Sequence, residues 1–221
     1  MKKYMLLLGA GPGESPDEFR SKYINDHAER LAKYPDIIHL TANLLAEPTE
    51  EMIKAGWGWG GKDDSGILAI DEVWMEKENP MSHYKDINVI GAYETKEIRV
   101  RDCSPDWPKG EASHWVKRMG LLKCFDEQRP EDFHQYWEHI HAPKALKHHI
   151  GAGKYYQNHF VKTIKEAPVE WSGSMSLCYW NVDAFQFGHF SQPDSREVIA
   201  EDGSHFMDRF LALYAIEYVM K

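Results

Sequence analysis

One helical stripe constrains the fold of this chain more than any other sequence feature. Residues 133–143 read FHQYWEHIHAP, which places Phe133, Trp137 and His141 at successive steps of four. On an α-helix these side chains share one face, and two large aromatic rings there predict that the face packs against a core. The stripe ends, however, in an imidazole that titrates near neutral pH. The pattern therefore predicts a helix whose buried face carries a group capable of proton transfer.

A second copy of the stripe lies in the first half of the chain. Phe19, Tyr23 and His27 have the same spacing, and each stands 114 residues before its counterpart. Each copy follows an apolar, strand-like segment and precedes another strand-like segment that carries asparagine. Duplication of one unit is the simplest interpretation of this constant offset.

The second copy also carries a family resemblance. Its pattern, P-x-x-F-x-x-Y-W-x-x-x-H-A-P followed by a strand with Q-N, resembles the EthD family of the dimeric α+β barrel superfamily. The matching residues are Pro130, Phe133, Tyr136, Trp137, His141, Ala142, Pro143, Gln157 and Asn158. The first half departs from the pattern, with Lys22 in the place of Tyr136 and Glu29 in the place of Pro143. Its match to the family is therefore weaker.

The order of strand and helix patterns predicts an α+β fold with two tandem ferredoxin-like (βαββαβ) repeats. We place the repeats at residues 1–107 and 108–221, joined by a linker at residues 102–110 that contains two prolines. Residues 79–90 are expected to be at least partly helical. The resemblance implies that the two sheets close a pseudo-dimeric α+β barrel, in which the fused chain replaces the dimer of single-repeat members.

Composition excludes several classes of function. The net charge is −9 and no basic stripe is present, which argues against a nucleic-acid partner. The apolar run at residues 4–10 is too short to span a membrane or to serve as a signal sequence. Three cysteines without a C-x-x-C spacing favour a reduced, cytoplasmic setting.

His141 is the strongest catalytic candidate. A buried but titratable imidazole suits a general base, and Tyr136 could supply a proton or orient a substrate oxygen. His27 is the equivalent candidate in the first half. The alternative interpretation of His141 is a core histidine whose nitrogens are satisfied by hydrogen bonds. The resemblance favours the catalytic role, because related barrel proteins hold their ligand between helix and sheet.

The aromatic residues around this stripe are candidates for substrate binding. With 8 tryptophans and 11 tyrosines the chain is rich in aromatic residues, which suits a pocket for a flat, apolar ligand. Only one of Tyr155 and Tyr156 can face the helix, since neighbouring strand residues point to opposite faces. The residues 56–61, GWGWGG, either fold over a ligand or form a plain loop fixed by packed tryptophans. The expected binding residues are Phe133, Trp137, Tyr155, Asn158 and Tyr23.

Histidines are frequent in the second half, yet their spacing does not predict a metal site. His134, His141 and His148 follow one another at seven-residue intervals, a rise of about 10.5 Å on a helix, which is too far for two ligands of one ion. There is also no dinucleotide-binding or phosphate-loop motif. We therefore expect no metal and no cofactor, with a haem bound by an axial histidine as the alternative.

These inferences together predict a small-molecule enzyme. The resemblance implies an aromatic or polyketide-like substrate, and His-based proton abstraction would lead to elimination, cyclisation, isomerisation or retro-aldol cleavage, as in a lyase or isomerase. Two alternatives stay open. One is a non-catalytic protein that binds a small ligand, and the other is a cofactor-free or haem-dependent oxygenase. A homodimer through the outer surfaces is also compatible with the sequence.

Overall fold

The computed structural model describes residues 1–57, 65–76 and 79–221. The chain is an α+β protein whose strands, all antiparallel to their neighbours, form one closed barrel in the order β1-β3-β2-β8-β5-β7-β6-β4. The strands are β1 (Lys2–Gly9), β2 (Ile37–Ala46), β3 (Ala69–Met75), β4 (Asn88–Arg101), β5 (Val116–Lys123), β6 (Ala152–Lys165), β7 (Gly173–Tyr179) and β8 (Arg209–Val219).

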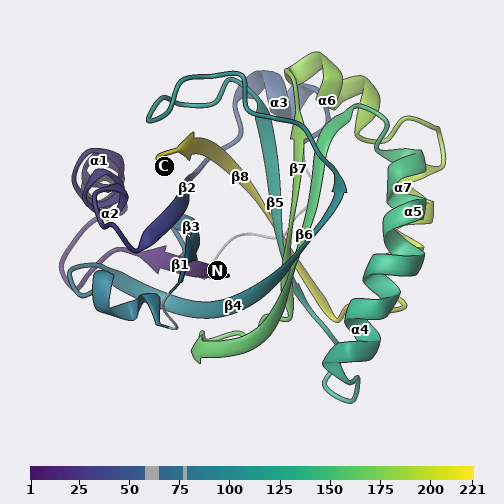
Figure 1. The fold of residues 1–221 in the computed structure, drawn as a ribbon. Helices are drawn as coiled ribbons and strands as arrows, with labels where there is room; N and C mark the ends of the chain where they lie inside the picture. The colour runs from purple at the N-terminus through teal and green to yellow at the C-terminus, as the bar shows by residue number, and fades with distance from the viewer. Residues whose placement is uncertain (58–64, 77–78) are drawn as a thin grey trace.

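Two groups of helices cover the outside of the barrel on opposite sides (Figure 1). The helical segments are α1 (Pro16–Lys22), η1 (Tyr23–Ala28), α2 (Glu29–Ala32), α3 (Glu50–Lys54), η2 (Pro80–His83), α4 (Pro130–Tyr136), η3 (Trp137–His141), α5 (Ala142–His148), α6 (Val182–Gly188) and α7 (Ser195–Gly203). The segments η1 and η3 are π-helical, and η2 is a 3-10 helix. Ser15 caps α1 through a capping box with Glu18, as the sequence Ser-Pro-x-Glu predicts.

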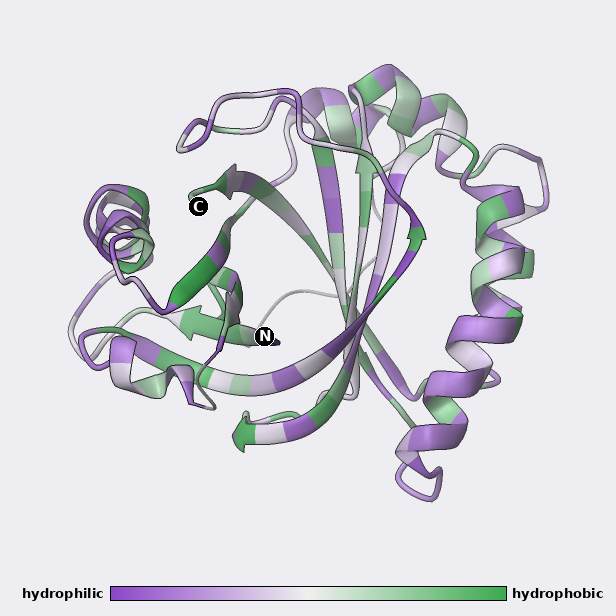
Figure 2. Cartoon of the chain, viewed as in Figure 1, coloured by the Kyte–Doolittle hydropathy of each residue, from purple (hydrophilic) through white to green (hydrophobic). Residues whose placement is uncertain are grey.

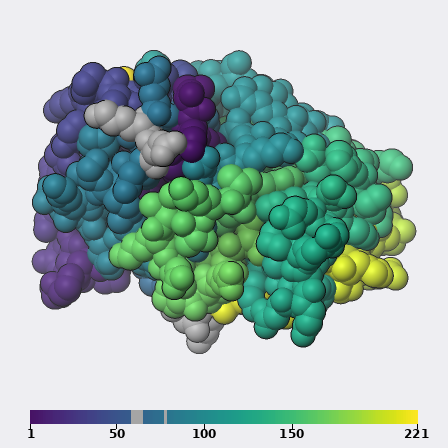
Figure 3. Space-filling view, turned by 60° about the horizontal axis from the view of Figure 1, so that its bottom comes forward, coloured from purple at the N-terminus to yellow at the C-terminus, as the bar shows by residue number. Residues whose placement is uncertain are grey.

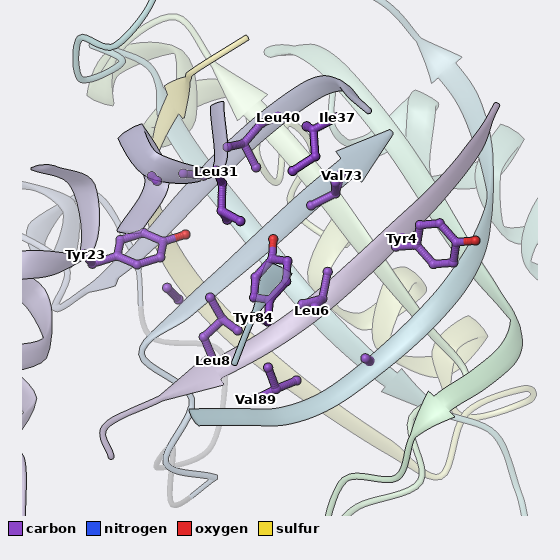
Figure 4. Packing of buried hydrophobic residues seen from close by; sticks show 14 of the residues in the cluster. Tyr4, Leu6, Leu8, Tyr23, Leu31, Ile37, Leu40, Val73, Tyr84 and Val89 are labelled. Carbon is purple, nitrogen blue, oxygen red and sulfur yellow. The ribbon is translucent and has the colours of Figure 1, made fainter. Parts of the chain in front are cut away.

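Strand β1 is buried on both faces because it lies between the helices and the barrel interior. Tyr4, Leu6 and Leu8 belong to the core between the sheet and α1–α2, whereas Met5 and Leu7 belong to the core inside the barrel. Figure 4 shows the first group with Tyr23 and Leu31 of the helical layer. The run Met5–Leu8 therefore has no polar alternation, and this part of β1 is green in Figure 2.

The two halves of the barrel have the same strand order. It reads β4-β1-β3-β2 in the first half and β8-β5-β7-β6 in the second, and the halves join through the pairs β2–β8 and β4–β6. Figure 3 shows second-half chain, in green, directly against first-half chain, in blue. The halves therefore share one continuous sheet and one interior.

Buried lysines link the halves inside the barrel. Lys3 of β1 donates a hydrogen bond of 2.6 Å to Asn158 of β6, and Lys117 of β5 donates one of 2.6 Å to Asn43 of β2. Lys3 and Lys117 differ by the same 114 residues as the two stripes. Each lysine of one half thus bonds the asparagine of the other, and both lysines are at most 5% exposed.

Glutamates neutralise these two lysines. Glu72 accepts from both of them, at 2.6 Å from Lys3 and 3.2 Å from Lys117, and Glu217 accepts a second bond from Lys117. Burial acts to raise the pKa of Glu72, but the nearby lysines outweigh it and hold that pKa well below its usual value. The interior therefore contains a closed ion-pair network at one end, next to the apolar cluster around Met5 and Leu7.

The structure refines two of the expected elements. The segment at residues 79–90, expected to be at least partly helical, contains the short 3-10 helix η2 and then enters β4 at Asn88, where β4 pairs with β1. The long helix that carries the second stripe is interrupted by η3. Pro143 lies in the first turn of α5. It does not by itself cause the π-helical turn η3, because the π-helical turn η1 forms at the equivalent place in the first half, where Glu29 stands in the position of Pro143.

Gly173 is required by the contact between this helix and the sheet. A Cβ atom at Gly173 would lie 2.6 Å from the ring of Trp137 and 2.9 Å from the backbone oxygen of Asn158. We expect Gly173→Ala to lower the free energy of unfolding by about 1–3 kcal/mol, measured by urea denaturation. Gly11→Ala is the matched control, because its Cβ would meet nothing closer than 3.7 Å. Equal effects of the two substitutions would contradict this account of the packing.

Candidate active site

The π-helical turn η3 positions the end of the second stripe. Phe133 and Trp137 are fully buried against the sheet, and His141 is 9% exposed at the last residue of η3. A π-turn adds a residue to the helical circuit, and such turns are frequent at functional sites. The predicted stripe thus exists as one face of the helix, with its imidazole directed toward the protein interior rather than toward solvent.

His141 forms a dyad with a buried carboxylate. Its Nδ1 lies 2.6 Å from Oδ2 of Asp202 on α7, and the Asp202 side chain is almost inaccessible to solvent. Burial acts to raise the pKa of Asp202, but hydrogen bonds from His141 and Lys144 hold it well below its usual value. An ionised carboxylate only accepts, so Nδ1 carries the proton and the lone pair of the neutral ring lies on Nε2.

Two further side chains fix Asp202 from the solvent side. The hydroxyl of Tyr136 donates to Oδ1 at 3.1 Å, and the ammonium of Lys144 donates to the same oxygen. Both side chains are partly exposed. Tyr136 therefore contacts the carboxylate of the dyad and does not line the cavity beside His141.

An apolar cavity of about 50 Å³ lies between the helical layer and the outer face of the second-half sheet. Its lining residues are Arg118, Leu122, Trp137, His141, Ala145, His149, Tyr155, Met175, Leu177, His189, Phe190, Ile199, Phe206, Met207 and Phe210. Among these, Phe190, Met207 and Phe210 are partly exposed and mark the side on which the cavity meets solvent. A ligand larger than a few atoms enters only if these flexible side chains move outward.

Burial shifts the pKa values of several polar groups that line the cavity. Burial lowers the pKa of His149 to about 4 and that of His189 well below its usual value, so both imidazoles are uncharged at pH 7. Burial raises the pKa of Tyr155 to about 12, which keeps its hydroxyl protonated. The guanidinium of Arg118 is 1% exposed and carries a full positive charge in this apolar space.

The expected binding residues separate into two groups. Tyr155 and Trp137 line the cavity, and Phe133 supports Trp137 from within the same core. Asn158 does not join them, because it points into the barrel and accepts the hydrogen bond from Lys3. Tyr156 also lies on that inner face, where its hydroxyl bonds Asp102.

The glycine- and tryptophan-rich loop lies partly outside the described residues, since these exclude residues 58–64. Its Trp57 is buried and crosses from the first half into the core of the second. The Trp57 ring lies 5.1 Å from that of Phe185 and 5.6 Å from that of Tyr214, between ring centres. Trp57 is thus a fixed anchor, which agrees with the plain-loop interpretation for this residue.

The first-half stripe has a different environment. Tyr23 and Tyr84 both donate to the buried carboxylate of Asp71 on β3, and Nε2 of His27 lies 3.5 Å from the same group. Asp71 stands on the sheet at the place that Met175 occupies in the second half, as their pairing with Leu6 and Gly120 shows. The carboxylate and its tyrosines fill the space that is a cavity in the second half.

His27 borders a different hollow, on the protein surface. A pocket of about 280 Å³ lies between α1, η1 and the residues before β4, and its other lining residues include Phe19, Tyr23, Asp26 and Arg30. Arg30 lies 3.2 Å from Nδ1 of His27. The two equivalent histidines are therefore brought into separate sites, with His141 at the apolar cavity and His27 at the surface pocket.

Sequence reasoning missed Asp202 and Arg118. Asp202 lies in a polar segment far from the stripe, and nothing in its local pattern distinguishes it from other acidic residues. Arg118 offered a detectable signal, because it and Lys117 are adjacent charged residues inside a strand pattern at residues 115–125 that is otherwise mostly apolar. Only the folded chain places both beside His141.

In the described part of the chain, no group of three histidine, cysteine or acidic side chains is arranged to hold a metal ion. Within residues 1–57, 65–76 and 79–221, no helix is both long and apolar enough to cross a membrane.

The closed sheet with outer helices defines an α+β barrel. Three solved structures share this fold over nearly the whole chain: an anthrone oxidase-like protein (8% identity, TM-score 0.58, covering 99% of this chain and 92% of the other), a candidate monooxygenase from Lactobacillus acidophilus NCFM (12%, 0.50, 99% and 95%), and a mutant chlorite dismutase from Candidatus Nitrospira defluvii (9%, 0.51, 97% and 90%). At such low identities the likeness concerns the fold alone.

A family model matches part of the second half of the chain. Residues 126–209 match the EthD domain, which confirms the resemblance inferred from the second stripe. This match contains the whole His141–Asp202 dyad. No curated protein matches the sequence.

Proposed function

We propose that the chain is a cofactor-independent enzyme that removes a proton from a small aromatic or polyketide-like substrate, with His141 as the general base. The observation that carries this proposal is the 2.6 Å contact between His141 and Asp202 at the edge of an enclosed apolar cavity. A carboxylate that holds Nδ1–H leaves Nε2 as the proton acceptor and stabilises the imidazolium that forms.

The remaining groups of the cavity support the same chemistry. The apolar lining excludes water and strengthens each electrostatic interaction around the reacting atoms. Tyr155 keeps its proton at neutral pH and can donate a hydrogen bond to a substrate carbonyl or phenol oxygen. Proton removal beside such an oxygen then leads to elimination, cyclisation, isomerisation or retro-aldol cleavage, depending on the leaving group.

The size of the cavity favours a small, flat ligand over a haem. At about 50 Å³ it is below the roughly 300 Å³ of ordinary ligand pockets. A ring compound needs only an outward movement of side chains such as Met207 and Phe190. A porphyrin would require the helical layer to separate from the sheet, where Trp137 packs directly on Gly173. The residues present do not fit a haem in this cavity.

The first experiment is a thermal-shift screen with phenolic, lignin-derived and polyketide-like compounds, followed by mass spectrometry of any compound that stabilises the protein. For a converted compound, we expect His141→Gln to lower the rate by about 10²–10⁴-fold, because general base catalysis contributes that much. Glutamine has a similar shape, so the melting temperature should change little.

His139→Gln is the matched control, since His139 lies on the same helix but faces solvent. This variant should retain the wild-type rate. A wild-type rate in His141→Gln would contradict the proposed base. A comparable loss in His27→Gln would show that the first half also takes part.

We also infer that the chain consists of two tandem ferredoxin-like repeats, at residues 1–107 and 108–221. The equal strand order of the halves and the reciprocal bonds of Lys3 and Lys117 support this inference. The shared interior takes the place of a dimer interface, and a homodimer would use the outer surfaces. The three free cysteines are compatible with the reducing conditions of the cytoplasm.

A further inference from the structure

Gln157 of β6 makes contacts that the general base alone does not explain. Its side chain is fully buried, and its amide nitrogen donates hydrogen bonds to the backbone oxygen of Trp137 at 3.0 Å and to the hydroxyl oxygen of Tyr155 at 2.9 Å. Its amide oxygen lies 3.1 Å from Nε2 of His159. One side chain thus contacts both the π-helical turn that carries His141 and a tyrosine of the cavity.

These hydrogen bonds fix which end of the amide faces Tyr155. A backbone oxygen only accepts, so the group that faces Trp137 is the NH₂ group of Gln157. Burial lowers the pKa of His159 to about 3, so its ring is neutral at pH 7, and its one proton lies on Nε2, where the amide oxygen accepts it. Both ends of the amide give the same orientation, in which the Tyr155 oxygen receives a hydrogen from Gln157.

The hydroxyl of Tyr155 cannot donate to the group that donates to it. Its own proton therefore points away from Gln157, and Tyr155 lines the cavity together with His141. Burial raises the pKa of Tyr155 to about 12, while the side chains of Gln157 and Trp137 act in the opposite direction, as donors to a phenol oxygen do. The hydroxyl thus keeps its proton at pH 7 and can use it in a hydrogen bond to a ligand.

The first half has apolar residues in place of this pair. In the register of the sheet, Ala42 of β2 stands at the place of Gln157, and Leu40 stands at that of Tyr155. The π-helical turn η1 nevertheless forms there. A glutamine is therefore not needed to make such a turn, and Gln157 accompanies the tyrosine that lines the apolar cavity.

We propose that Gln157 is a positioning residue that makes Tyr155 a hydrogen-bond donor to the ligand, and that the ligand presents a carbonyl oxygen at this point. This inference rests on the proposed function and names the group of the substrate that the cavity recognises. His141 takes the proton from the carbon beside the carbonyl, and the C–H electron pair moves toward the carbonyl oxygen. The hydroxyl of Tyr155 stabilises the negative charge that develops on that oxygen.

The proposal predicts that a ketone oxygen contributes to binding through Tyr155. The probes are 1-indanone and indane, which have similar shapes but of which only 1-indanone has an acceptor oxygen, with dissociation constants measured by NMR titration. The readout is the ratio of the two affinities, since a purely structural change weakens both probes alike. We expect Tyr155→Phe to lower the preference for the ketone by about fivefold or more, because the ring stays and the donor is lost. An unchanged ratio, or a wild type that binds neither probe, would overturn the proposal.

Substitution of the glutamine tests the positioning role. Gln157→Met fills a similar volume without hydrogen bonds, so the tyrosine proton can turn elsewhere and the preference for the ketone should fall by about threefold. Gln157→Ala, which copies Ala42 of the first half, is the second variant should the first not fold. Gln135→Met is the matched control, since Gln135 is an exposed glutamine on α4, and it should keep the wild-type ratio.

Two results would overturn the assignment of Gln157. One is a wild-type ratio in a folded Gln157 variant. The other is the failure of both variants to fold, which would give the glutamine a structural role that the alanine at the equivalent place in the first half does not predict.

A variant of the general base separates this inference from the proposed reaction. His141→Gln leaves the tyrosine and glutamine in place, so it should retain the wild-type ratio for the two probes while losing turnover of the compound identified in the screen. If His141→Gln retains turnover, the proposed base is wrong, yet the donor site stands on the binding data. If Tyr155→Phe leaves the ratio unchanged but His141→Gln loses turnover, the reaction stands and the donor site does not.

Discussion

Lys117→Met should lower the free energy of unfolding by about 3 kcal/mol at pH 7, near the lower end of values for a broken buried ion pair. Lys117 donates hydrogen bonds to Asn43, Glu72 and Glu217 inside the barrel and is 1% exposed. Methionine fills a similar volume but leaves Glu217 with only the 3.7 Å contact to Lys154. Urea denaturation of both proteins measures the difference.

The loss of stability in Lys117→Met should depend on pH. Burial acts to raise the pKa of Glu217, but the nearby lysines, Lys117 first, outweigh it and lower the pKa. A carboxyl group with a lowered pKa in the folded state stabilises the protein above its unfolded pKa, and that stabilisation is lost as the pH falls. In Lys117→Met the carboxyl group takes up a proton more easily. The stability gap between the proteins should therefore narrow between pH 7 and pH 4.

Lys96→Met is the matched control for this substitution. Lys96 is largely exposed, and its Nζ lies 3.6 Å from Glu138. Surface ion pairs of this kind contribute little, so the change should stay below about 1 kcal/mol. A loss in Lys117→Met no larger than that of the control, or a gap that stays constant with pH, would contradict the role of the interior network.

Asp202→Asn should lower the rate of the proposed reaction by about 10²–10⁴-fold. The amide cannot stabilise the imidazolium of His141, and it no longer favours the tautomer with the proton on Nδ1. The measurement is the turnover of the compound identified in the screen, together with the melting temperature. Wild-type turnover in this variant would show that the 2.6 Å contact has only a structural role.

Two controls isolate the contribution of the dyad. Asp132→Asn removes an exposed carboxylate from α4, whose partner is the neighbouring Arg129, and should leave the rate unchanged. Lys144→Met removes a partly exposed group that bonds Asp202 without facing the cavity. This variant should show a smaller loss than Asp202→Asn, because the carboxylate remains and His141 still contacts it.

The local patterns of the sequence predicted most of the elements that carry the site. Helix spacing placed Phe133, Trp137 and His141 on one face, and this face is buried. Strand alternation showed that only one of Tyr155 and Tyr156 could face the helix, although it could not tell which. At residues 79–90 the expected helical character is confined to η2 (Pro80–His83), because β4 begins at Asn88 and pairs with β1.

The sequence alone determined the duplicated stripe, the EthD resemblance and the choice of His141, since each depends on residues close together in the chain. Only the tertiary structure decided which groups act on that histidine. Asp202 lies 61 positions from His141 along the chain, and Arg118 stands on strand β5 and not on the helix that carries His141. The structure also decided what occupies the space between the helices and the sheet in each half. Asp71 and its tyrosines fill it in the first half, whereas Met175, at the equivalent position, lines a cavity in the second. Spacing encodes the periodicity of one helix or strand, whereas a site between layers depends on contacts that the closure of the barrel creates.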